Sequence, residues 1–267
     1  MKATIESITP APVWNAARNT WLALNHASQW PLATLHPWRR SSIRQLAAYK
    51  DKHKGQRAFI LGNGPSLKQT DVSRLKDEFT FGMNRVYLAF PDWGFHTSYF
   101  ASINSLVIEQ CAQDIRELPM PKFLSWRSRH LIEPTEDTMF LHSTYTSPKF
   151  SKDVRGRVWE GATVTYVALQ LAFHMGFETV ILIGVDHSFK SSGQPNTTVV
   201  SQGDDPDHFD ADYFGKGFRW QLPDLDTSEV GYHMARQAYE ADGRKVLDAT
   251  IGGKLTVFPK VEYDSLF

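Results

Sequence analysis

Short apolar runs alternate with longer amphipathic segments along most of the chain. Ala58 to Leu61 form one run, which stops abruptly at Gly62, and Thr179 to Ile183 form another. Apolar runs of this length between turn residues predict buried strands, and a continuous run is typical of a strand covered on both faces of a parallel sheet. Further strands are predicted at residues 79–83, 97–103, 122–126, 140–145, 245–248 and 254–258.

Helical periodicity fills the intervals between these strands. It is clearest from Glu160 to Met175, where apolar residues share one face and Gly176 follows as the closing residue. Other helices are predicted at residues 13–26, 41–52, 71–76, 106–117 and 227–242. Strands that alternate with helices predict an α/β three-layer sandwich with a mostly parallel sheet. We expect residues 1–55 to be a helical N-terminal arm and residues 56–267 to be the main domain.

The segment from Arg57 to Leu67 combines the first strand with a glycine turn, Gly62-Asn63-Gly64-Pro65, and with Ser66, which opens a helix-compatible stretch. Glycine lets a ligand approach the backbone closely, and a helix start capped by serine favours an anion such as a nucleotide phosphate. The alternative is an ordinary strand-to-helix turn. The pattern is neither a P-loop nor a complete GxGxxG motif.

Polar residues follow several of the predicted strands. Asn84 follows the second strand, Ser102 and Asn104 end the third, and Asp186 and His187 follow the strand at 179–183. Ligands of open α/β sheets bind at the carboxyl ends of the strands, so this coincidence predicts a polar small-molecule site. Each residue also has a structural alternative, since asparagine often forms turns and a histidine can be purely structural.

Asp186 has three possible roles. Its carboxylate could hold a divalent metal such as Mg²⁺, bind a ligand hydroxyl, or cap the segment that follows it.

Residues 190–225 are polar and predict a long loop or lid, of a kind that is usually functional when it is ordered. His208 is a candidate general base, and Lys216 and Arg219 are candidates to neutralise a leaving phosphate. The alternative is a solvated loop.

Composition narrows the range of functions. Lys and Arg together number 29, as do Asp and Glu, so no overall charge favours nucleic acid. Cys111 is the only cysteine, which excludes an intramolecular disulfide and a cysteine-rich zinc site and suits a reducing cytosol. The first residues lack the apolar core of a signal peptide. The arm is rich in tryptophan and basic residues, so it either packs on the domain or docks on a membrane surface or partner.

Three of these segments together resemble a known family. Leu61 to Leu67, Ser102 to Asn104, and the stretch from Glu160-Gly161-Ala162-Thr163 to Asp186-His187 resemble the 6-hydroxymethylpterin diphosphokinase MptE-like family. They resemble the Cst-type bacterial sialyltransferases more distantly. The likeness covers roughly residues 56–190 and implies a Rossmann-like fold that binds a nucleotide and transfers a pyrophosphoryl group or a sugar.

Carried over by position, the resemblance assigns residues 62–66 to the nucleotide phosphate, and Asn84 and Asn104 to phosphate, ribose or base. Ser102, beside Asn104, and Thr163, in the longer motif, are assigned to the nucleotide site as well. The chain departs from the families at two places. Asn104 stands where the MptE-like pattern has an acidic residue, and residues 187–189 replace the tyrosine pair of the sialyltransferases.

These observations predict a cytoplasmic transferase. The arm adds a second possibility, that the enzyme is peripheral at the inner membrane. The first hypothesis is a glycosyltransferase of polysaccharide or glycoconjugate assembly that uses a CMP-sugar-like donor. Its candidate catalytic residues are Asp186, His187, His208, Lys216 and Arg219. The acceptor would be a glycan, a lipid-linked glycan or a small alcohol. The alternatives are a Mg²⁺- and ATP-dependent pyrophosphokinase and a non-catalytic nucleotide-binding module. We expect no tightly bound cofactor and no nucleic-acid partner. We expect the arm to contact a membrane or a second copy of the chain.

Overall fold

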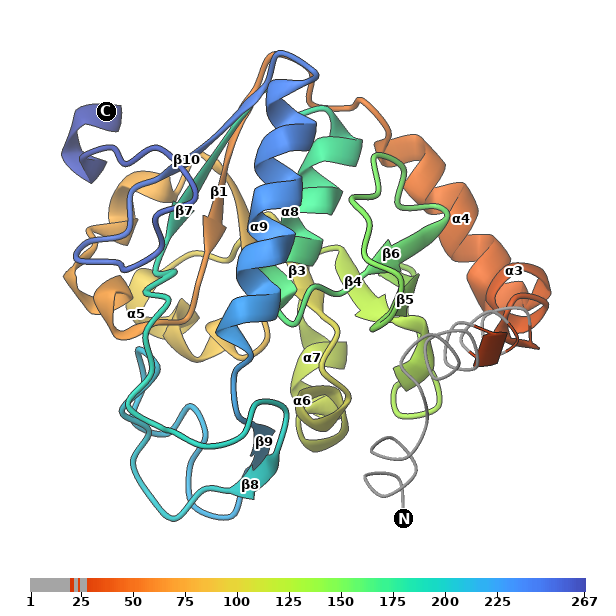
Figure 1. The fold of residues 1–267 in the computed structure, drawn as a ribbon, viewed down its shortest axis with the longest axis horizontal. Helices are drawn as coiled ribbons and strands as arrows, with labels where there is room; N and C mark the ends of the chain where they lie inside the picture. The colour runs from red at the N-terminus through yellow and green to blue at the C-terminus, as the bar shows by residue number, and fades with distance from the viewer. Residues whose placement is uncertain (1–19, 22–23, 25–27) are drawn as a thin grey trace, which may run out of the picture.

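The computed structural model describes residues 20–21, 24 and 28–267 and shows one eight-stranded parallel sheet between helical layers (Figure 1). The order across the sheet is β10-β7-β1-β2-β3-β4-β5-β6. The strands are β1 (Arg57–Leu61), β2 (Phe79–Met83), β3 (Tyr99–Ser102), β4 (Lys122–Ser125), β5 (Thr138–Thr144), β6 (Arg157–Trp159), β7 (Thr179–Ile183) and β10 (Lys245–Asp248). This arrangement confirms the predicted α/β Rossmann-like fold.

The two faces of the sheet follow from the alternation of side chains along each strand. In β1, Ala58 and Ile60 pack into the core beneath α8 (Val164–Met175) and α9 (Leu225–Glu240). Phe59 and Leu61 point to the opposite face. That face is covered by α5 (Phe90–Trp93), α6 (Ser105–Gln110), α7 (Ala112–Glu117) and the 3₁₀ helices η1 (Pro65–Gln69), η2 (Val72–Leu75), η3 (Val86–Ala89), η4 (Trp126–Ser128) and η5 (Tyr263–Leu266).

The chain reverses its direction across the sheet between β1 and β7. It runs outward from β1 to β6, returns through α8, and lays β7 along the free side of β1, with Ala58 opposite Val180. The backbone N–H of Gly62 donates to Ile183 O at 2.7 Å, and that of Gly64 donates to Gly184 O at 2.9 Å. The two strand ends are therefore joined at the topological switch point, where open α/β sheets bind ligands.

The outer part of the sheet is covered by the arm helices α3 (Leu32–Leu35) and α4 (Pro37–Tyr49). Packing of α4 on β5 includes a hydrogen bond from Phe140 N to Ser42 Oγ at 2.9 Å. This bond satisfies a backbone donor on a part of β5 that β6 does not pair. The helix predicted at residues 13–26 lies mostly on positions that the structure does not describe, and the domain boundary after residue 55 stays a prediction.

Several element bounds differ from the sequence-based predictions. The helix predicted from Glu160 begins at Val164, because Gly161 and Ala162 have φ values of 56° and 55°. The helix predicted at 106–117 is two helices, separated at Cys111 (φ −123°). These backbone turns interrupt the helical hydrogen bonds although the apolar pattern continues.

The strand predicted at 254–258 is wrong, since these residues form no strand, and the isolated bridge of this region joins Asp248 to Lys260. Conversely, β6 was not predicted. The lid contains an antiparallel hairpin, β8 (Thr198–Val200) with β9 (Arg219–Gln221). The middle of the lid packs on the domain, because Phe209, Tyr213 and Phe214 are buried in the same core cluster as Phe59. The lid therefore combines a packed middle with a largely exposed stretch at residues 190–201.

Candidate functional site

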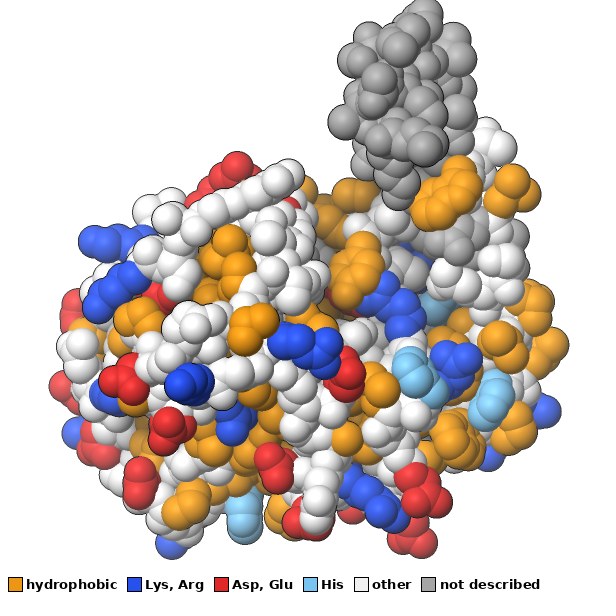
Figure 2. Space-filling view, turned by 90° about the horizontal axis from the view of Figure 1, so that it is seen from below, with side chains coloured by type: hydrophobic (Ala, Val, Ile, Leu, Met, Phe, Trp, Pro, Cys, Tyr) orange, Lys and Arg blue, Asp and Glu red, His pale blue; other side chains and the backbone are white. Residues whose placement is uncertain are grey.

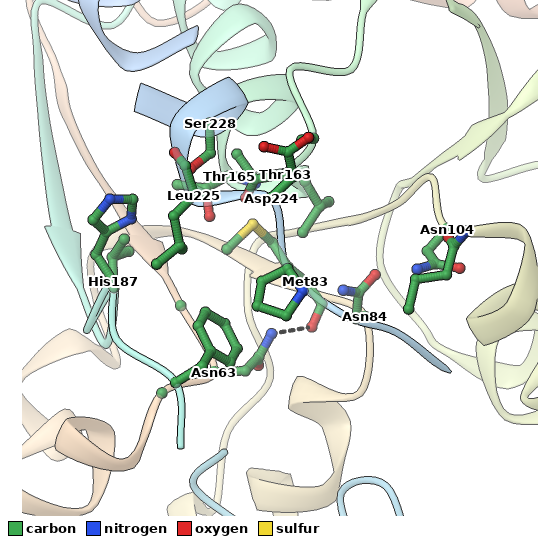
Figure 3. Close-up of a pocket in the computed structure, with 18 of the residues that line it drawn as sticks. Asn63, Met83, Asn84, Asn104, Thr163, Thr165, His187, Asp224, Leu225 and Ser228 are labelled. Carbon is green, nitrogen blue, oxygen red and sulfur yellow. Dashed lines mark hydrogen bonds between the residues drawn. The ribbon is translucent and has the colours of Figure 1, made fainter. Parts of the chain in front are cut away.

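A cavity of about 570 Å³ lies at the carboxyl edge of the sheet. Its walls are the ends of β1, β2, β3, β6 and β7, the N-termini of α8 and α9, and the lid. Figure 3 shows Asn63, Asn84 and Asn104 below Thr163 and Ser228, with His187 at the other side of the view. Seen from below in Figure 2, the molecule carries acidic and basic side chains interspersed, so no single sign of charge dominates this face.

The glycine turn is shaped by contact between two strand ends. A Cβ atom added to Gly62 would lie 2.5 Å from the carbonyl carbon of Gly184, and one added to Gly64 would lie 2.5 Å from Asp186 Cγ. The glycines therefore allow the turns after β1 and β7 to interlock. The backbone N–H groups of Gly62 and Gly64 are hydrogen-bonded within this contact, so the turn is not the open phosphate-binding loop that we expected. Nucleotide binding at these residues stays a prediction.

Asp186 fills the place where we expected a phosphate. Its Oδ1 accepts from Ser66 N at 3.1 Å, and its Oδ2 accepts from Ser66 Oγ at 2.6 Å. The segment that begins at Pro65 is a five-residue 3₁₀ helix rather than an α-helix. Asp186 therefore caps the segment after β1 rather than the segment that follows it in the chain, and Ser66 is buried behind the turn instead of facing the cavity.

Three asparagines follow adjacent strands, as predicted, and all three line the cavity. Asn63 Nδ2 donates to Met83 O at 3.1 Å, and its buried Oδ1 has no hydrogen-bond partner among the described residues. Asn84, with φ 51°, accepts from Ser102 Oγ through Oδ1 at 3.0 Å, which leaves its amide N–H groups for a ligand. Asn104 caps α6 by accepting from Leu106 N at 2.9 Å. Ser102 is a buried support for Asn84 and does not line the cavity.

Two helices direct their N-termini into the cavity. Thr163 caps α8 through a hydrogen bond from Thr165 N at 3.3 Å. Asp224 caps α9 by accepting from Thr227 N at 3.0 Å. The positive end of a helix dipole favours anions. At α9 the Asp224 carboxylate already offsets it, so α8, with its uncharged cap, is the helix end that can attract a ligand anion.

His208 lies on the cavity wall with its ring held in place. Its Nδ1 lies 2.8 Å from Asp205 Oδ2, and its ring stacks on Tyr213 with centroids 4.0 Å apart. When a carboxylate accepts the proton of Nδ1, Nε2 is left as the basic nitrogen. The lid therefore presents an oriented histidine to the cavity.

His187 makes a similar pair with Glu229, with Nε2 and Oε1 2.9 Å apart. Its backbone is left-handed, at φ 54°, which turns it from β7 toward α9. In this pair Nε2 is the engaged nitrogen, so His187 links two elements of the cavity wall.

Lys216 and Arg219 do not reach the cavity. Lys216 is exposed, and Arg219 Nη2 pairs with Glu109 Oε1 at 2.9 Å on the outside of the lid. Of the predicted nucleotide-binding residues, Pro65, Ser66 and Ser102 also lie outside the lining. The lining includes Gly62, Asn63, Gly64, Asn84, Asn104 and Thr163.

Glu160 is a cavity residue that the sequence analysis missed. Its carboxylate pairs with Arg127 Nη2 at 2.5 Å, and the guanidinium carbon of Arg127 lies 3.7 Å from the ring centroid of Tyr145, which also lines the cavity. Burial raises the pKa of the Glu160 carboxyl, while Arg127 opposes the rise. Recognition of β6 would have revealed it, because Glu160 then directly follows a strand.

Each of the four described carboxylates that line the cavity has a partner within the protein. Asp186 is bound to Ser66, Glu160 to Arg127, Asp224 to Thr227, and Asp207 accepts from Lys190 N and Ser191 N. No cluster of three or more His, Cys, Asp or Glu suited to a metal occurs within the described part of the chain. The metal role of Asp186 stays a prediction.

Fold and cavity define a Rossmann-like α/β protein with a polar ligand site at the switch point of its sheet. The model of the 6-hydroxymethylpterin diphosphokinase MptE-like family matches residues 33–192, and the chain belongs to this family. Membership places it in a transferase-like superfamily. No helix among the described residues is long and apolar enough to cross a membrane.

One solved structure with a similar fold is the MAf glycosyltransferase from Magnetospirillum magneticum AMB-1. The TM-score is 0.50 and the sequence identity 14%, over 97% of this chain and 43% of the other. This chain therefore spans less than half the length of that enzyme, and the likeness concerns the fold. No curated protein sequence matches the chain.

Proposed function

We propose that the chain is a glycosyltransferase that uses a nucleotide-linked sugar donor, with a glycan, lipid-linked glycan or small alcohol as acceptor. The observation that carries the proposal is the cavity itself, where three strand-end asparagines face the N-terminus of α8. Amides can bind ribose, base or phosphate, and the helix N-terminus favours the phosphate charge. A cytoplasmic enzyme of polysaccharide or glycoconjugate assembly fits this chemistry.

His208 would act as general base. Nε2 takes the proton of an acceptor hydroxyl while the hydroxyl oxygen bonds to the anomeric carbon of the donor sugar. The bond from that carbon to the phosphate oxygen breaks, and the nucleotide leaves with the electron pair. Asp205 keeps the proton on Nδ1 and stabilises the imidazolium that forms. Positioning within the cavity would supply much of the remaining rate enhancement.

The first experiment is a thermal-shift screen of CMP, CTP, CDP, UDP, GDP, AMP and ATP, each with and without Mg²⁺. A ligand that binds the native state raises the melting temperature by mass action. We expect a cytidine nucleotide to stabilise the protein without a metal, and Asn84→Ala to lose the shift while keeping its circular dichroism spectrum. An Asn84→Ala variant that still binds would remove Asn84 from the site, and no shift with any nucleotide would overturn nucleotide binding.

The role of His208 as general base is tested separately, in a turnover assay. His208→Gln should bind nucleotide normally but lose kcat by about 10²-fold or more, the usual scale of general base catalysis. Asp205→Asn should reduce kcat while leaving KM for the donor unchanged. Full activity of His208→Gln would eliminate this mechanism, and nucleotide that binds but is never consumed would favour a non-catalytic module.

A second candidate is pyrophosphoryl transfer from ATP to the hydroxymethyl group of a pterin-like alcohol. The description of the matching family favours it. Aromatic side chains on the cavity wall, including Tyr145 and Trp159, could stack on a pterin ring. This reaction requires Mg²⁺ and releases AMP. Stabilisation only by ATP or AMP with Mg²⁺, and AMP as product, would replace the first proposal with this one.

A further inference from the structure

A second cavity, of about 500 Å³, lies where the arm meets the outer strands. It shares no described lining residue with the first cavity. Three arginines and a histidine contribute to its walls, and none of the described residues that line it is acidic. The lining residues are Trp30, Ala33, Thr34, Arg39, Ile43, His142, Arg155, Gly156 and Arg157.

Arg39 is the unusual member of this cavity. It belongs to the basic stretch of the arm, yet it is only 1% exposed. Its Nη2 donates to Arg155 O at 2.6 Å and to Gly156 O at 3.4 Å, whereas Nε and Nη1 have no hydrogen-bond partner in the described part of the chain. A buried guanidinium without a counter-ion is costly, so these two donors point to an absent anionic partner.

The neighbouring charges do not neutralise Arg39. Arg155 makes a bidentate pair with Asp153, from Nε to Oδ1 at 2.9 Å and from Nη2 to Oδ2 at 2.5 Å, and this pair accounts for the nearby carboxylate. Arg157 donates to neutral acceptors, Thr144 Oγ1 and the carbonyl oxygens of Thr146 and Ser147. Burial lowers the pKa of Arg39 to about 10, so its charge persists at neutral pH.

We propose that this cavity binds a phosphate or diphosphate group. Nη1 of the Arg39 guanidinium can donate to such an oxyanion, Nε on another edge offers a second donor, and Arg157 supplies further positive charge. Arg39 and Arg157 have no carboxylate partner among the residues that the structure describes, and no acidic residue is among the described lining residues, which favours a multiply charged phosphate over a single carboxylate. The apolar wall of Trp30, Ala33 and Ile43 can also receive an organic body attached to the phosphate.

The test compares Arg39→Met with Arg40→Met. Arg40 is the next residue on α4, is exposed and does not line the cavity, so it controls for the loss of one positive charge. Inorganic phosphate, pyrophosphate and hexyl phosphate are titrated by calorimetry against both variants and the parent, in the Asn84→Ala background as well. We expect pyrophosphate to bind the parent and Arg40→Met equally, and at least tenfold more weakly to Arg39→Met.

Arg39→Met should also melt no lower than the parent in anion-free buffer, because it removes an unpaired buried charge. If Arg39→Met does not fold, hydrogen exchange of the parent decides, with added pyrophosphate expected to slow exchange at residues 30–43 and 155–157. Unchanged affinity of Arg39→Met, absence of anion binding by the parent, or protection confined to the first cavity overturns the proposal. Tighter binding of hexyl phosphate than of phosphate identifies a lipid-like source, and equal binding identifies a free phosphate.

Discussion

Gly62 lies so close to Gly184 that no side chain fits between them, and this contact holds the ends of β1 and β7 together at the cavity. The added Cβ of Gly62→Ala would lie 2.5 Å from the backbone carbon of Gly184 and 2.9 Å from Val185 Cγ2. Because backbone atoms must move, we expect the free energy of unfolding to fall by about 3 kcal/mol. Urea denaturation measures the change.

Gly203→Ala is the matched control for this prediction. No atom lies within 4 Å of its added Cβ. Its stability should stay the same or rise by up to about 1 kcal/mol, because alanine restricts the unfolded chain. Equal stabilities of the two variants would show that the interlocked turns separate without cost.

Protonation of His174 provides a second residue-scale prediction. The side chain is fully buried, and its Nε2 lies 2.8 Å from Leu46 O. Burial lowers the pKa of His174 in the folded state, although Asp153 opposes this effect. The unfolded chain, with a pKa near 6.5, therefore takes up protons first as the pH falls. The contribution of His174 to stability is complete above that value and is lost as the pH falls through the lowered folded value.

His174→Gln should flatten the dependence of the unfolding free energy on pH below about 6.5, the unperturbed histidine value. Chemical denaturation at a series of pH values measures this slope. His233→Gln on α9 is the control, because this side chain is exposed in the folded state. An equally steep slope in His174→Gln would assign the pH dependence to other groups.

At the scale of elements, the cap of α8 both stabilises a helix and shapes the cavity. Thr163→Ala removes the acceptor for Thr165 N, so we expect a loss of about 1 kcal/mol in unfolding free energy. Thr163→Ser keeps the hydroxyl and should retain most of the stability. Thermal and urea denaturation test this prediction, and equal stability of the serine and alanine variants would contradict it.

The sequence predicted the elements whose pattern is local. The strands at 58–61 and 179–183 were found because continuous apolar runs end at glycine. β6 was missed because it has only three residues and begins with Arg157. The start of α8 was misplaced because left-handed backbone at Gly161 and Ala162 leaves no trace in periodicity.

The candidate site shows the same division. Its location at the strand ends followed from topology, and the three asparagines do share one cavity. The pairing of Asp186 with Ser66 joins positions that are far apart in the chain. The placement of Lys216 and Arg219 away from the cavity likewise depends on the tertiary structure. Such contacts depend on how β7 and the lid pack, which a single sequence does not encode in any local pattern.

At the scale of the whole molecule, the lid should behave as part of the domain. Phe209 N donates to Asn63 O at 2.8 Å, and Phe209 and Tyr213 are buried against the sheet. We therefore expect hydrogen exchange at Phe209 to be protected nearly as strongly as in β1. The two strands of the lid hairpin, Thr198–Val200 and Arg219–Gln221, have no buried residue and should exchange faster. Rapid exchange across all of residues 190–225 would show that the lid opens independently.

The position of β1 also bears on how the protein is made on the ribosome. β1 leaves the exit tunnel early, but its partner β7 is synthesised about 120 residues later, roughly 10 seconds at ordinary elongation rates. During this interval one edge of the future central strand has no neighbour, and an apolar strand edge can pair with other nascent chains. Codons that slow translation between β1 and β7 should therefore lower the yield of folded protein, whereas slow codons after β10 should not.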